Sequence, residues 1–144
     1  MYRINDTVLA TLELPLADPV LSRNMYVSKM LRLPLAIMEA LVSGADELPK
    51  TKFLGYSEHD WTVAQLMLFL DASNGKFKNI PFASQVKFEL HSTDGCSDEA
   101  GFWVESWYNG ELLSFDDHCK DPIRCIYPEF LQMLQAKGFV YTDT

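Results

Sequence analysis

The segment Thr51–Asp71, "TKFLGYSEHDWTVAQLMLFLD", sets the expected fold because a short apolar run gives way within it to a helical pattern. The part "KFLGYS" (52–57) is typical of a short buried strand. The part "WTVAQLMLFLDA" predicts a helix capped by Ser57 or Asp60, with an apolar face made by Val63, Leu66, Met67 and Leu70. The loop between them carries His59 beside Asp60. Loops at the carboxyl ends of strands in open α/β sheets bind ligands, and helix starts attract anions, so the pair is a candidate site.

The residues after this segment predict an antiparallel part. In "SQVKFELH" (84–91) apolar and polar residues alternate, which is typical of a half-exposed strand. Asn109-Gly110 lies between two further alternating runs and is a strong hairpin signal, so residues 102–108 are expected to pair with 111–115. Pro128 suits the first turn of a last helix, which we expect to close at Gly138.

The residues before the segment are less regular. Residues 1–19 are apolar but interrupted by two prolines, and only 8–14 suggest an extended piece. Apolar residues then recur at helical spacing up to Val42. Because Pro34 should break or kink that run, we expect a helix that starts after it and ends at Ser43-Gly44. The whole pattern predicts a mixed α/β fold.

Length and composition limit the function classes. With 144 residues, 48% of them hydrophobic, we expect residues 1–144 to form one domain with a real core. A formal charge of −8 argues against binding to the nucleic-acid backbone, which needs a basic surface. No apolar run approaches the ~20 residues of a membrane span, and residues 1–16 lack the features of a signal peptide.

Three cysteines and one sequon bear on the compartment. Cys119 and Cys125 flank Pro122, and this spacing leaves a disulfide and two reduced thiols equally open. Asn5 starts "NDT", an N-glycosylation pattern that also arises by chance. Together these features favour a secretory route.

Other polar candidates are expected to be structural. His118 with the two nearby cysteines suggests a metal site, but no fourth ligand is apparent, so we expect no metal ion there. His91 ends a strand and is interpreted as structural. Asp116 and Asp117 are interpreted as a solvated turn.

The aromatic residues of the hairpin are open to two interpretations. Trp103 and Trp107 lie four apart, and in an alternating strand they fall on the same face. With Tyr108 they would make a sugar-binding platform, but such residues more often belong to a core or an interface.

Four stretches occur in the order seen in one family: "YSEHDWTVAQL", "IPFASQVKFELH", "FWVESWYNGELL" and "CKDPIRCIYPEFLQML". This pattern resembles the histidine acid phosphatases of the histidine phosphatase superfamily, and it covers Lys52 to Lys137. The resemblance implies the C-terminal part of a histidine phosphatase-like sheet with flanking helices. It also implies a Cys119–Cys125 bridge that leaves Cys96 single, a lysosomal or extracellular location, and no cofactor.

The resemblance assigns chemistry to the pair. Asp60 would be the general acid that protonates the departing alkoxide, and His59 would donate a hydrogen bond to the phosphoryl oxygens. From the dipeptide alone, Asp60 would be a helix cap and His59 a loop residue. The Arg-His-Gly motif that carries the family's nucleophile is missing from this sequence. The chain is therefore expected to be inactive alone and to hydrolyse phosphomonoesters only beside a polypeptide that supplies that motif. The alternative is a non-catalytic structural or interaction protein within a complex.

The missing half also predicts a partner surface. In the family, the strand equivalent to 52–57 is central in its sheet. Here one neighbour would be missing, which leaves an apolar edge with unpaired backbone groups. We therefore expect another polypeptide to cover this strand.

Overall fold

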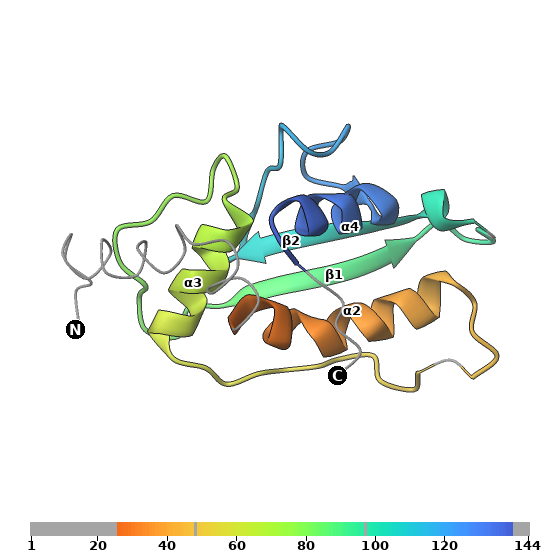
Figure 1. Cartoon of the computed structure of the whole chain (residues 1–144), viewed down its shortest axis with the longest axis horizontal. Coiled ribbons are helices and arrows are strands. Elements are labelled where there is room, and N and C mark those ends of the chain that lie inside the picture. The colour runs from red at the N-terminus through yellow and green to blue at the C-terminus, as the bar shows by residue number, and fades with distance from the viewer. Residues whose placement is uncertain (1–25, 48, 97, 140–144) are drawn as a thin grey trace.

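The computed structural model describes residues 26–47, 49–96 and 98–139. Two helices come first along these residues, the strands follow, and a last helix comes after them (Figure 1). The elements in chain order are α2 (Ser28–Val42), α3 (Asp60–Leu70), β1 (Val86–Ser92), the 3-10 turn η2 (Glu99–Gly101), β2 (Phe102–Tyr108), β3 (Glu111–Leu112), β4 (Cys125–Ile126) and α4 (Tyr127–Ala136).

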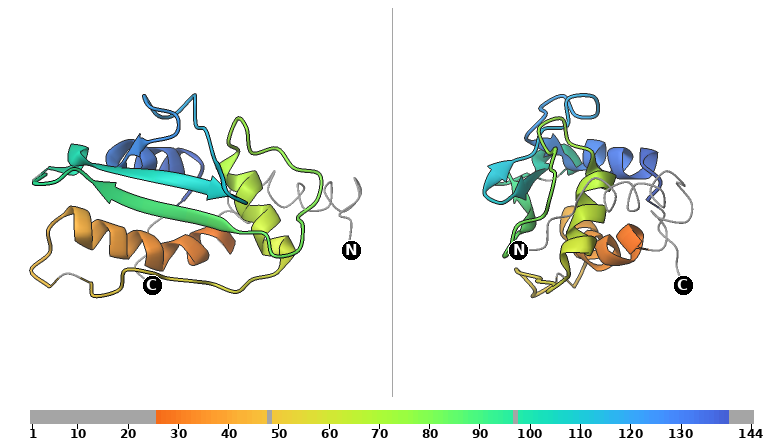
Figure 2. Two further views of the ribbon diagram at one scale, coloured as in Figure 1. Left: turned by 180° about the vertical axis from the view of Figure 1, so that it is seen from behind. Right: turned by 90° about the vertical axis from the view of Figure 1, so that its left-hand side faces the viewer.

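The described elements form a sheet with helices on one of its faces. Seen along the molecule, α2 and α4 lie on the same side of β1 and β2 (Figure 2). Alternate strand residues face these helices and join the core, among them Phe88, which packs on Phe130 of α4 with ring centroids 6.0 Å apart. The mixed α/β class is therefore confirmed, with an antiparallel sheet of four strands among the described residues.

Strand β2 is the centre of the sheet. It pairs with β1 from Val86↔Tyr108 to Ser92↔Phe102, and at its other edge with β3 and β4. The predicted hairpin turn is confirmed, because Asn109 and Gly110 have φ values of 49° and 86°, as a type I′ turn requires. The half-exposed strand predicted at 84–91 is found as β1 (Val86–Ser92), in which Val86, Phe88 and Leu90 pack against the core.

Strand β3 is shorter than predicted, since it ends at Leu112 and not at Phe115. The loop after α3 takes the backbone groups that a longer strand would use. Asn74 accepts from the Ser114 N–H at 2.8 Å and donates to the Leu112 carbonyl at 2.7 Å. The Ser73 N–H donates to the Ser114 carbonyl at 2.9 Å.

Helix α2 corrects the prediction at Pro34, because it runs from Ser28 through the proline to Val42. Its buried side chains keep one stripe on both sides of Pro34, made by Ser28, Leu31, Leu35, Met38 and Val42. An internal proline costs about 3 kcal/mol, and each fully buried Leu or Val contributes about 1.5–3 kcal/mol. Packing of the stripe therefore outweighs the proline. The predicted end is confirmed, since Gly44 has φ 65° and the Ala45 N–H donates to the Ala40 carbonyl, as in a Schellman motif.

The predicted buried strand at 52–57 is wrong. Residues 49–59 form no helix or strand, and 51–60 are exposed. Phe53 is 84% exposed and Tyr56 is 48% exposed. A strand needs a neighbour for its backbone groups, and no described strand lies beside this segment.

Helix α4 and the disulfide close the described part of the chain. Pro128 lies in the first turn of α4, as predicted, and Gly138 ends the helix with φ 95°. Cys119 and Cys125 are bridged, with Cα atoms 5.2 Å apart, and Cys96 is free. Of the described helices, none is long and apolar enough to cross a membrane.

Candidate functional site

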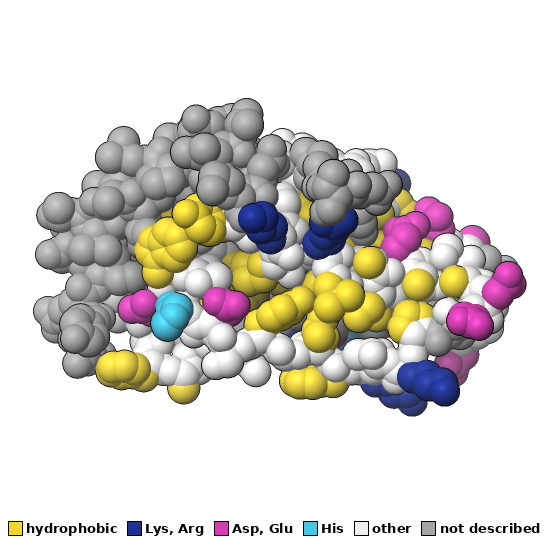
Figure 3. All heavy atoms as spheres, turned by 60° about the horizontal axis from the view of Figure 1, so that its bottom comes forward, with side chains coloured by type: hydrophobic (Ala, Val, Ile, Leu, Met, Phe, Trp, Pro, Cys, Tyr) yellow, Lys and Arg dark blue, Asp and Glu magenta, His cyan; other side chains and the backbone are white. Residues whose placement is uncertain are grey.

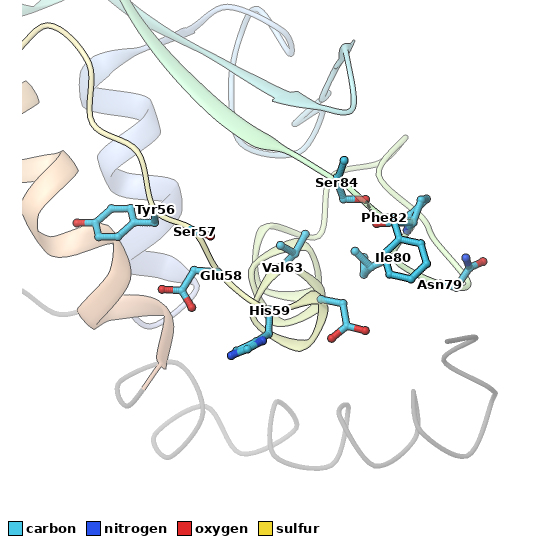
Figure 4. A pocket seen from close by; sticks show the side chains of 12 residues that line it. Tyr56, Ser57, Glu58, His59, Val63, Asn79, Ile80, Phe82 and Ser84 are labelled. Atoms are coloured by element: carbon cyan, nitrogen blue, oxygen red, sulfur yellow. Dashed lines mark hydrogen bonds between the residues drawn. The ribbon is translucent and has the colours of Figure 1, made fainter. Parts of the chain in front are cut away.

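A pocket of about 560 Å³ lies at the start of α3. One wall comes from the segment before the helix and the other from the loop before β1 (Figure 4). The lining residues are Tyr56, Ser57, Glu58, His59, Asp60, Val63, Asn79, Ile80, Pro81, Phe82, Ala83 and Ser84. The predicted pair His59 and Asp60 therefore lines this pocket.

The backbone at the helix start explains how the pair is held. His59, not Ser57 or Asp60, is the N-cap, with φ −84° and ψ 158°, and its side chain makes no capping hydrogen bond. Its carbonyl accepts from the Thr62 and Val63 N–H groups at 3.0 and 3.2 Å. Asp60 Oδ1 accepts from the Trp61 N–H at 2.7 Å. These N–H groups are thus already used within the first turn, which lowers its capacity to bind an anion by itself.

The two side chains of the pair differ in their surroundings. In Figure 4 the His59 ring points away from Asn79, Ile80 and Phe82. Asp60 is exposed and keeps its second oxygen for another partner. Within the described residues, His59 has no hydrogen-bond partner for its ring. The pair is accessible, and nothing in the described chain fixes the imidazole.

The far wall of the pocket is tied to the hairpin turn. Asn109 Oδ1 accepts from the Gln85 N–H at 2.8 Å, and Asn109 Nδ2 donates to Ser84 Oγ at 3.3 Å. The Ser84 hydroxyl in turn donates to the Pro81 carbonyl at 2.8 Å. The turn residue that sets the β2–β3 register thus also positions the loop 79–84.

The charge of the pocket is negative. Its lining contains the carboxylates of Glu58 and Asp60 and the imidazole of His59, and no Lys or Arg. Exposed hydrophobic side chains gather on the face along which residues 49–59 run (Figure 3). A phosphate group would need cations that these lining residues do not supply.

Sequence reasoning missed part of this site. Glu58 is a second carboxylate beside Asp60, and its Oε2 lies 3.4 Å from the Thr62 hydroxyl. Residues 79–84 had no predicted part in the site, and no local pattern shows that they return to the start of α3. That proximity comes from the hairpin turn at Asn109, a contact distant in sequence.

The remaining predicted site residues lie elsewhere. Cys119 and Cys125 form a disulfide, so neither thiol is available to a metal ion with His118. Trp103 and Trp107 share the sheet face opposite the described helices and are only half-buried, so they are not core residues. Asp116 and Asp117 lie in an exposed turn, as predicted, and Asp116 also accepts hydrogen bonds from Ser73 and Ser114. Asn5 lies outside the described residues.

Comparison with protein-family models gave no match, and comparisons with curated proteins and with solved structures gave none either.

Proposed function

We propose that this chain supplies the general acid for phosphomonoester hydrolysis and works only beside a polypeptide that carries the nucleophile. The proposal is the function implied by the resemblance to the C-terminal part of histidine acid phosphatases. The observation that supports it most is the pocket at the start of α3, lined by Asp60 and His59. A volume of about 560 Å³ lies within the range of small-molecule sites.

Asp60 has the chemistry that an acid requires. An alkoxide is a poor leaving group, and protonating it during bond cleavage contributes ~10²–10⁴-fold to the rate. The Trp61 N–H binds only Oδ1, so Oδ2 is available to carry a proton toward the ester oxygen. His59 would donate a hydrogen bond to the phosphoryl group once a partner orients its ring.

The composition of the pocket supports the need for a partner. Two carboxylates without a lining cation repel a phosphate dianion, so the missing positive charge has to come from outside these residues. A partner with an Arg-His-Gly loop would bring both the cation and the nucleophilic imidazole. The disulfide is consistent with the oxidising compartments through which secreted and lysosomal enzymes pass, and we infer a secretory route on that basis.

The test is to capture the chain from its source, identify what copurifies, and assay the complex. We expect a polypeptide with an Arg-His-Gly motif and phosphatase activity at acid pH, whereas the pure chain should release no p-nitrophenol from its phosphate ester. In the complex, Asp60→Asn should lower kcat by about 10²–10⁴-fold for an alkyl phosphate. The loss should be smaller for p-nitrophenyl phosphate, because that leaving group needs less protonation.

Two matched variants separate the roles. Asp94→Asn, which removes an exposed carboxylate in the turn between β1 and β2, should leave kcat unchanged. If Glu58→Gln lowers kcat and Asp60→Asn does not, the general acid is Glu58. A complex without phosphatase activity would favour the alternative of a structural or interaction subunit. Turnover by the pure chain that disappears in Asp60→Asn would contradict the need for a partner.

A further inference from the structure

The sheet face opposite the described helices carries a cluster of charged side chains. Glu89 and His91 are two residues apart on β1 and so point to the same face. Glu105 on β2 is the direct cross-strand partner of Glu89. Like charges placed directly opposite each other destabilise a sheet, so this pair requires compensation.

Two basic side chains each interact with one oxygen, Oε1, of the two carboxylates. Lys87 lies 2.7 Å from Glu89 Oε1, and Arg124 lies 3.3 Å from Glu105 Oε1. The remaining oxygen of each carboxylate, Oε2, faces the Nε2 atom of His91. Three ligand-type atoms therefore converge between the strands.

The distances within this group do not suit direct hydrogen bonds. His91 Nε2 is 3.5 Å from Glu89 Oε2 and 3.6 Å from Glu105 Oε2, whereas an N–H···O bond measures about 2.7–3.2 Å. The Nε2 atom is also shielded from solvent and has no hydrogen-bond partner among the described residues. A tetrahedral ion with bonds of about 2.0–2.2 Å holds its ligand atoms roughly 3.3–3.6 Å apart. The observed separations match that spacing.

Neighbouring residues hold the three side chains in place. The His91 ring stacks on Trp103, with centroids 5.4 Å apart and planes 11° apart. Trp107 Nε1 donates to Glu89 Oε2 at 3.0 Å. Such outer contacts orient ligands in metal sites.

We propose that Glu89, His91 and Glu105 bind a divalent transition-metal ion of the Zn²⁺ class, with water completing its coordination. One imidazole nitrogen and two carboxylate oxygens are ligands that Zn²⁺ accepts, and the ion would neutralise the repulsion between the two carboxylates across β1 and β2. The ion has a path to the site, because the side chains of His91 and Glu89 are 38% and 36% exposed. The site is separate from the pocket at α3 and does not depend on the proposed phosphatase role.

The experiment is a calorimetric titration of the untagged full chain with Zn²⁺, repeated on single variants. The wild type should bind one Zn²⁺ per chain, and His91→Gln and Glu105→Gln should each weaken binding by at least about tenfold. The matched controls His118→Gln and Glu111→Gln change exposed residues outside the cluster and should keep the wild-type affinity. Lys87→Gln removes a cation that competes for Glu89, so it should tighten binding.

Amide hydrogen exchange of the wild type is a second measurement, and it does not depend on how the variants fold. Saturating Zn²⁺ should slow amide hydrogen exchange in β1 and β2 of the wild type and leave α4 unchanged. Absence of Zn²⁺ binding to the wild type would overturn the proposal, as would binding that His118→Gln removes and His91→Gln does not.

Discussion

At the scale of single residues, Gln65 is the side chain whose burial is least expected. It lies in α3 with 1% of its surface exposed, and neither polar atom of its amide makes a hydrogen bond within the part of the chain that the structure describes. An unpaired buried amide lowers the free energy of unfolding by about 1–3 kcal/mol, so Gln65 destabilises the folded chain. Helix α3 is otherwise apolar nearly all round, which is typical of a helix enclosed by other elements.

Replacing Gln65 by Met should therefore stabilise the chain. The two side chains are similar in length, and Met removes the unpaired polar atoms while keeping the packing. We expect the free energy of unfolding to rise by about 1–2 kcal/mol, measured by urea denaturation. Gln85→Met, at an exposed position in the loop before β1, is the control and should gain little. A loss of stability in Gln65→Met would show that the amide has a partner.

At the scale of elements, Asp116 joins two loops that the sequence leaves unconnected. Its carboxylate accepts hydrogen bonds from Ser73, after α3, and from Ser114, after β3. The bond from Ser73 is the larger cause, and the two together hold the pKa of Asp116 below its ordinary value. The same two loops are joined by Asn74, whose hydrogen bonds to Leu112 and Ser114 accompany the early end of β3.

The lowered pKa predicts how stability depends on pH. Because the folded-state pKa of Asp116 is depressed, its contribution is present above its unfolded pKa of about 3.9 and is lost as pH falls through the folded value. Asp116→Asn should therefore lower Tm at neutral pH, and the difference from wild type should shrink below about pH 4. Asp117→Asn, which removes the neighbouring exposed carboxylate, is the matched control. A Tm difference that stays constant from neutral to acid pH would contradict the role of the charge.

The helices and strands differ in how well local sequence patterns predict them. The strands β1 and β2 and the turn at Asn109-Gly110 follow from local patterns, because alternation and left-handed turn residues act within a few positions. The course of α2 through Pro34 depends on tertiary packing, which local propensity does not contain. Strand β4 has only two residues and pairs with a distant part of β2, so no local signal predicts it.

The candidate site also has a part that the sequence predicts and a part that it does not. His59 and Asp60 were predicted from the residues, and their place at the start of α3 follows from the helical pattern after them. The opposite wall, 79–84, is brought there by Asn109, and the cluster around His91 depends on the register between two strands. Both need pairings that form only in the folded chain.

At the scale of the whole molecule, the exposed segment 49–59 is the most unusual surface of the described chain. Phe53, Leu54 and Tyr56 are 84%, 38% and 48% exposed, and no described strand pairs with the backbone between them. Contiguous exposed apolar side chains on a protein of this size mark an interaction surface or an aggregation site. The segment is extended and adjoins the candidate site, so a second polypeptide that pairs with it would also reach His59 and Asp60.

We predict that the native chain is held in a complex in which another polypeptide lies against residues 52–57, and that the isolated chain self-associates through them. Sedimentation velocity at micromolar concentration should show oligomers for the wild type and more monomer for Phe53→Ser combined with Tyr56→Ser, because these changes remove apolar area from the contact. Phe82→Ser is the matched control, since Phe82 is 78% exposed but lies in the loop before β1. Its sedimentation should equal that of the wild type. A stable wild-type monomer with slow amide exchange across 52–57 would instead show that the chain covers this segment itself and needs no partner there.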